Sequence, residues 1–151
     1  MSRVFVTGIG IISSIGLNAE ENLSSLRSGK NGIRKAKYFH SKFADSYYFG
    51  EVDMSDDDLR SHCGVSYQKE LTRTTLLSMC AFSEAIKDAN ISDDDLRDAS
   101  TAFISSSTVG GMCYTDDLYT DANLKGNPSD YIRSYEGSDH TLRIIRKYGI
   151  T

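Results

Sequence analysis

Three cysteines and three histidines are the side chains of this sequence that could serve as a nucleophile or a base. A cysteine acts as a nucleophile when a nearby base or a helix N-terminus lowers the pKa of its thiol. Cys80 falls in a predicted buried helix, where a thiol stays protonated, and Cys113 follows a glycine turn that brings neither feature. The cysteines are too widely spaced for a C-x-x-C motif. The sequence therefore predicts no metal site and no activated thiol among Cys63, Cys80 and Cys113.

Serine and histidine do not form a recognisable set either. The segment Ser105 to Gly111 (SSSTVGG) is a turn of the kind that carries serine nucleophiles, but it lacks the G-x-S-x-G pattern. The histidines lie in polar segments, and we expect them to be exposed rather than catalytic: His40, His62 and His140. The residues alone therefore indicate no catalytic constellation.

Glycines near the N-terminus follow a short β-branched run, as in dinucleotide-binding proteins. Gly8 and Gly10 form a G-x-G pair, but position 13 is a serine and the third glycine is Gly16. No strand ending in an acidic residue follows about 20 residues later, where a ribose partner is expected. The spacing therefore does not favour a nucleotide site.

Alternating runs of strand and helix character predict an α/β fold. Short β-branched and aromatic runs predict buried strands at Arg3–Thr7 and Thr101–Ser105, and a shorter strand near Tyr48–Val52. Capping residues and helical apolar spacing predict three helices, at 18–29, at 71–89 and ending at 142–148. The second of these is apolar over more than one stripe, so we expect it to be largely buried.

The hexapeptide SDDDLR occurs twice, at Ser55–Arg60 and at Ser92–Arg97. A serine followed by three aspartates suits the positive N-terminal end of a helix. A tandem repeat is not favoured, because nothing around the two copies matches. A calcium loop would also need a glycine and a terminal glutamate, which are absent.

Composition excludes several classes of protein. With 39% hydrophobic and 25% charged residues in 151, the chain can form a core. A net charge of −4 argues against nucleic acid as a partner. No apolar run reaches the roughly 20 residues of a membrane span, and the N-terminus does not resemble a signal peptide. Widely spaced, odd-numbered cysteines indicate reduced thiols, and we expect a cytoplasmic protein.

Four segments together resemble one known family. In order they are VFVTGIGIISSIG, LRSGKNGI, the helix at 71–89 and FISSSTVGG. They are similar in order and spacing to the β-ketoacyl synthases, and most of all to the elongating 3-oxoacyl-[acyl-carrier-protein] synthases. The resemblance implies a thiolase-like fold in αβαβα layers. Residues 1–151 would be a partial N-terminal domain, most of the first half of that fold, truncated before the nucleophile.

The reaction implied by the resemblance is the decarboxylative condensation of an acyl thioester with malonyl-carrier protein. The family uses a cysteine nucleophile, two histidines and a lysine, and the matching positions all fall beyond Thr151. We therefore expect no catalytic residue within this chain, an inactive fragment, and no cofactor. Two alternatives are a chain-length-factor-like subunit without the nucleophile and a remnant that only binds carrier protein.

The resemblance also implies roles for four residues of this sequence. Val109 matches a residue at the mouth of the acyl pocket, and Tyr131 and Ile132 match residues that reach across a dimer to the partner's pocket. Lys69 resembles a basic residue that docks the acidic acyl carrier protein. The expected partners are acyl carrier protein, acyl and malonyl thioesters, and a second subunit in a homodimer or a heterodimer.

Overall fold

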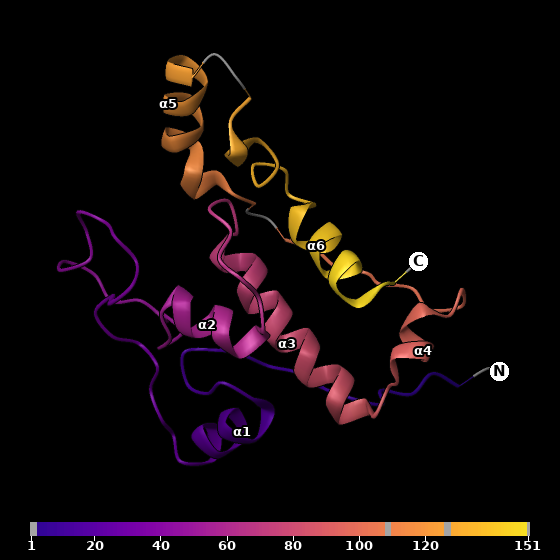
Figure 1. The fold of residues 1–151 in the computed structure, drawn as a ribbon. Helices are drawn as coiled ribbons and strands as arrows, with labels where there is room; N and C mark the ends of the chain where they lie inside the picture. The colour runs from indigo at the N-terminus through magenta and orange to yellow at the C-terminus, as the bar shows by residue number, and fades with distance from the viewer. Residues whose placement is uncertain (1–2, 108–109, 126–127, 151) are drawn as a thin grey trace. The chain divides into compact units, whose positions relative to one another are not determined.

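The computed structural model describes residues 3–107, 110–125 and 128–150 (Figure 1). The chain divides into two compact units, one made of Met1–Cys63 and Cys80–Asn90 and the other of Gly64–Met79 and Ile91–Thr151. The helices in chain order are α1 (Ala19–Arg27), α2 (Asp56–Cys63), α3 (Arg73–Ala89), α4 (Asp93–Arg97), η1 (Met112–Tyr114), α5 (Thr115–Lys125), η2 (Asp130–Ile132) and α6 (Asp139–Tyr148).

The predicted helices form near their predicted ends. Asn18 caps α1, because its Oδ1 accepts a hydrogen bond from the Glu21 N–H at 2.8 Å. Gly29 follows α1 and Gly149 follows α6, both at φ +67°, a left-handed conformation that glycine adopts without a steric penalty. The helix predicted at 71–89 is α3, which begins at Arg73.

Burial along α3 follows one stripe rather than several. Thr75, Leu76, Met79 and Cys80 are buried, while Leu77 is half-buried. The prediction of a largely buried helix is therefore correct for one face only.

The predicted strands do not form as regular strands in the described residues. Val4 is 95% exposed and Ile104 is 92% exposed, so neither segment is buried as the sequence predicts. A strand is held by hydrogen bonds from a neighbouring strand. Here only two isolated bridges are present, Ser13 with Gly16 and Arg34 with Phe49. In the second bridge, Phe49 belongs to the predicted strand near Tyr48–Val52. The layered αβαβα sheet is not seen in these residues.

In the first unit, the N-terminal segment runs extended along the second half of α3 (Figure 1). The Ile9 N–H donates to Asp88 at 2.9 Å, and the Ile11 N–H donates to Glu84 at 2.8 Å. A Cβ atom on Gly10 would lie 1.8 Å from the Ala81 carbonyl oxygen. Gly10 therefore permits close contact between the backbone of the N-terminal segment and that of α3. The Ile9 and Ile11 amides, which a nucleotide site would use to bind phosphate, instead donate to carboxylates.

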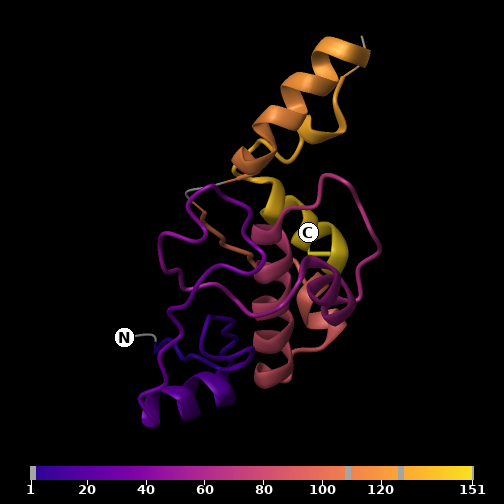
Figure 2. The same ribbon diagram turned by 90° about the vertical axis from the view of Figure 1, so that its left-hand side faces the viewer.

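In the second unit, α5 and η2 lie against each other (Figure 2), and α4 contacts α6. The Tyr114 ring packs on the Tyr131 ring with centroids 5.1 Å apart, and its hydroxyl donates to the Leu71 carbonyl at 3.2 Å. These contacts join η1 and η2 to the chain that precedes α3.

Both SDDDLR segments cap helices, as predicted. Asp58 and Asp95 accept a hydrogen bond from the serine hydroxyl three residues earlier, at 2.6 Å in each case. The serine oxygens in turn accept from the aspartate N–H groups at 3.1 Å. The backbone N–H groups of Ser55 and Ser92 donate to the same aspartates at 3.2 Å and 3.0 Å, which completes two capping boxes.

The caps predict an acid-dependent loss of stability. The hydrogen bonds from Ser55 and Ser92 lower the pKa of Asp58 and Asp95 from the usual value of an aspartate. A carboxylate with a lowered pKa stabilises the fold above its unfolded pKa, and this contribution is lost as the pH falls through the folded value. We expect the S55A/S92A variant to lose less stability than the wild type between pH 6 and pH 3. Urea midpoints across this range measure the difference, and equal acid sensitivity of the two proteins would contradict it.

Candidate functional site

Two of the predicted site residues lie together in the second unit. The Lys69 Nζ lies 4.6 Å from the centre of the Tyr131 ring and 3.7 Å from Asp121 Oδ2. A hydrogen bond to Tyr131 raises the pKa of Lys69, and the charge of Asp121 acts in the same direction. Ser129 donates to the same oxygen of Asp121 at 3.0 Å. Lys69 is therefore a positioned cation, and its side chain remains 44% exposed.

The other predicted positions differ in exposure. Tyr131 is 6% exposed, whereas the adjacent Ile132 is 54% exposed. Tyr131 thus packs within its own unit, and Ile132 offers an apolar surface next to it. Val109 lies outside the described residues.

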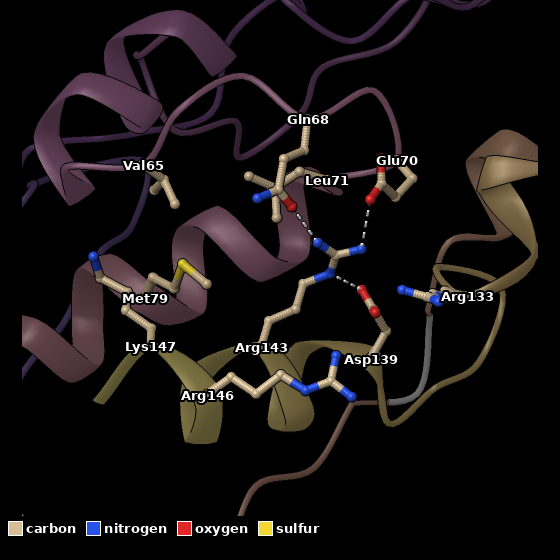
Figure 3. A pocket seen from close by; sticks show the side chains of 10 residues that line it. All are labelled: Val65, Gln68, Glu70, Leu71, Met79, Arg133, Asp139, Arg143, Arg146 and Lys147. Atoms are coloured by element: carbon tan, nitrogen blue, oxygen red, sulfur yellow. Dashed lines mark hydrogen bonds and ion pairs between the residues drawn. The ribbon is translucent and has the colours of Figure 1, made fainter. Parts of the chain in front are cut away.

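A cavity of about 480 Å³ is lined by Gln68 and Glu70, the residues on either side of Lys69 in the sequence (Figure 3). Arg143, which is 12% exposed, binds three side chains in it. The Nε of Arg143 donates to Asp139 at 2.6 Å, and Nη1 donates to Gln68 at 2.6 Å. The second terminal nitrogen, Nη2, lies 3.4 Å from Glu70 Oε1. Because Gln68 and Glu70 flank Lys69, this network ties the segment that carries Lys69 to α6.

The second unit also contains a polar pair, Ser105 and His140, that the sequence pattern does not predict. His140 is only 5% exposed, so the prediction that it is exposed is wrong. Its Nε2 lies 2.6 Å from Ser105 Oγ and 3.4 Å from Thr141 Oγ1. The neighbouring carboxylate of Asp139 binds Arg143 instead of the imidazole. No sequence signal links Ser105 to a histidine 35 residues away. His40 and His62 are exposed, as predicted.

The cysteines do not take part in this site. Cys63, Cys80 and Cys113, all in the described part of the chain, form no disulfide. A hydrogen bond to Cys63, together with burial, raises the pKa of the Cys80 thiol, so the predicted inert state of Cys80 agrees with its environment. Among the described residues, no cluster of metal-ligating side chains is present, and no helix has the length and apolar character to cross a bilayer.

Comparison with known proteins decides the family. The family profile of the beta-ketoacyl synthase N-terminal domain matches residues 1–139. The chain belongs to the β-ketoacyl synthase family. The resemblance of the four sequence segments to ketosynthases is therefore confirmed.

Curated ketosynthases from several bacteria are similar to this chain. The 3-oxoacyl-[acyl-carrier-protein] synthase 1 of Haemophilus influenzae is 32% identical over 73% of this chain and 26% of its own length. The corresponding protein of Escherichia coli K12 is 34% identical over 62% of this chain and 22% of its own. Synthase 2 of Synechocystis is 28% identical over 78% of this chain and 28% of its own. The chain thus spans about a quarter of the length of these relatives.

The fold is also that of a solved ketosynthase. A structure of the ishigamide ketosynthase/chain length factor superposes with a TM-score of 0.75 and 24% identity, over 96% of this chain and 36% of that one. The path of this chain is therefore that of a ketosynthase, although the described residues form helices and extended segments without a regular sheet.

Proposed function

We propose that these residues form the N-terminal part of a 3-oxoacyl-[acyl-carrier-protein] synthase of fatty-acid or polyketide synthesis. The match of residues 1–139 to the ketosynthase N-terminal domain carries this proposal. The coverage of about a quarter of each curated relative supports the view that the active protein is longer. In it, residues 1–151 are a partial domain that precedes the nucleophile, in a thiolase-like fold of αβαβα layers.

The proposed reaction joins two thioesters. A cysteine thiolate first takes the acyl group from its carrier, and the carrier thiol leaves. The malonyl group then loses CO2, the resulting carbanion attacks the acyl carbonyl, and the cysteine thiolate leaves as the new carbon–carbon bond forms. Two histidines and a lysine assist decarboxylation and stabilise the oxyanion. We place all four catalytic residues beyond residue 151, which agrees with the buried state of Cys63 and Cys80.

This segment contributes binding surfaces to the proposed enzyme. Val109 would border the acyl pocket. Of the two residues proposed to reach the partner's pocket across a dimer, Ile132 would contribute the exposed side chain, and the buried Tyr131 would hold the segment in place. The exposed apolar surface of Ile132 suits such a contact. Lys69 would bind the acidic carrier protein in the cytoplasm, and its position and charge suit that role.

The test is condensation by the native polypeptide that carries this sequence. The protein is purified, its mass measured, and it is incubated with acyl- and malonyl-carrier protein. We expect release of CO2, a 3-oxoacyl product, and loss of activity on alkylation of one cysteine outside residues 1–151. A protein that forms no product alone, but supports a ketosynthase partner without any reactive cysteine, would be a chain-length-factor-like subunit. A protein that binds carrier protein without either activity would be a binding remnant. Either result rejects the proposal.

Carrier docking predicts a kinetic effect of Lys69. We expect Lys69→Gln to raise the KM for the carrier-protein substrate about tenfold and to leave kcat unchanged, because a charge-assisted contact is worth about 1.5 kcal/mol. The matched control is Lys87→Gln, which removes an exposed lysine of α3. Steady-state kinetics at two salt concentrations measure both values. An equal effect of the two variants, or a fall in kcat alone, would exclude the docking role.

A further inference from the structure

The cavity shown in Figure 3 carries more positive charge than the described residues neutralise. Arg143 already binds the carboxylates of Asp139 and Glu70. The remaining charged side chains of the lining are all basic and all exposed: Arg133, Arg146 and Lys147. In the part of the chain that the structure describes, neither Arg133 nor Arg146 makes an ion pair.

These three cations come from two elements. Arg133 follows η2, whereas Arg146 and Lys147 lie in the last turn of α6. The helix dipole stabilises basic residues in the last turn of a helix. This effect explains why Arg146 and Lys147 lie at the end of α6, and it requires no ligand. It does not account for Arg133, which the fold brings to the same cavity from a separate segment (Figure 3).

The lining of the cavity also includes the hydrogen-bonded Arg143 network and several apolar side chains. The Arg143 network holds Gln68 and Glu70 against α6 through two contacts of 2.6 Å and 3.4 Å. Val65, Leu71 and Met79 line the cavity as well. A ligand with an anionic head and a small organic body matches both parts of this lining.

We propose that this cavity binds a phosphate monoester, with Arg133 and Arg146 as donors to the phosphate. A phosphate dianion offers three acceptor oxygens, and guanidinium groups bind it through paired N–H donors. The apolar side chains contact the organic group. This site is separate from the condensation chemistry proposed above and does not depend on it.

The test is titration of the protein with phenyl phosphate, inorganic phosphate and malonate at constant ionic strength. Calorimetry gives the affinities, and amide chemical shifts locate the site. We expect saturable binding of both phosphates, tighter for phenyl phosphate, with shifts in η2 and α6. The R133Q/R146Q variant is expected to bind at least about tenfold more weakly, because it lacks two charge-assisted donors.

The matched control is Arg27→Gln, which removes an exposed arginine from the last turn of α1. It should bind as the wild type does. Arg146→Gln alone is a second variant for use if the double variant does not fold, and its affinity should fall about threefold because one charge-assisted donor remains. The site is refuted by an absence of saturable binding, by equal losses in Arg27→Gln, or by tighter binding of malonate than of the phosphates. Because binding is measured without turnover, failure here is separable from failure of the condensation assay.

Discussion

Replacing Gly10 with alanine should lower the free energy of unfolding by about 3 kcal/mol, which is the upper range for inserting a methyl group into a well-packed site. The added Cβ atom would lie 1.8 Å from the Ala81 carbonyl oxygen and 2.7 Å from the Ala85 nitrogen. Both atoms belong to the backbone of α3, so no flexible side chain can move to relieve the overlap. The N-terminal segment must therefore shift away from the helix.

This shift also weakens the hydrogen bonds on either side of the glycine. The Ile9 and Ile11 amides donate to Asp88 and Glu84, and both bonds require the present distance between segment and helix. Thermal unfolding followed by circular dichroism measures the loss, which we expect as a fall in melting temperature of about 10 °C.

The control for this experiment is Gly137→Ala. No heavy atom lies within 4 Å of a Cβ atom built at Gly137, and its φ is not positive. We expect this variant to melt within about 2 °C of the wild type, since a surface substitution is nearly neutral. If both alanine variants melted alike, the close contact of Gly10 with α3 would be wrong.

Features fixed by neighbouring residues could be predicted from the sequence. A cap needs only a side-chain oxygen and an amide a few residues later, so Asn18, Ser55 and Ser92 mark the starts of α1, α2 and α4. A strand depends on hydrogen bonds with a second segment, which composition does not reveal. Val4 and Ile104 have the residue types of buried strands, and both are exposed in the structure.

The candidate site was predictable only in part. The family resemblance selected Lys69 and Tyr131, and the structure adds that the ammonium lies over the ring. His140 is buried and contacts Ser105, which is 35 residues away in the sequence. The polar residues next to His140 in the sequence predict an exposed side chain, and that prediction is wrong. The glycine spacing near the N-terminus argued against a nucleotide site, and the bonds of Ile9 and Ile11 to carboxylates agree.

The second large effect is expected at Arg143. The Arg143 side chain is 12% exposed, and its guanidinium binds two carboxylates. The side chain of Asp139 is 10% exposed and that of Glu70 is 24% exposed. Arg143→Met would leave two largely buried carboxylates facing each other without a cation. Removal of one partner of a buried ion pair costs about 3 kcal/mol, and we expect that loss in chemical denaturation.

The triple variant R143M/D139N/E70Q tests whether the unpaired carboxylates cause the instability of R143M, because it removes all three charges together. Removing all the charges leaves no unpaired ion in the buried site, so we expect the triple variant to recover most of the stability that R143M loses. A triple variant as unstable as R143M would show that lost packing of the arginine stem, not unpaired charge, is responsible. Glu70 and Gln68 flank Lys69, so release of this network should also displace Lys69 and raise the carrier-protein KM of R143M. The same network therefore both stabilises the unit and positions its proposed docking residue.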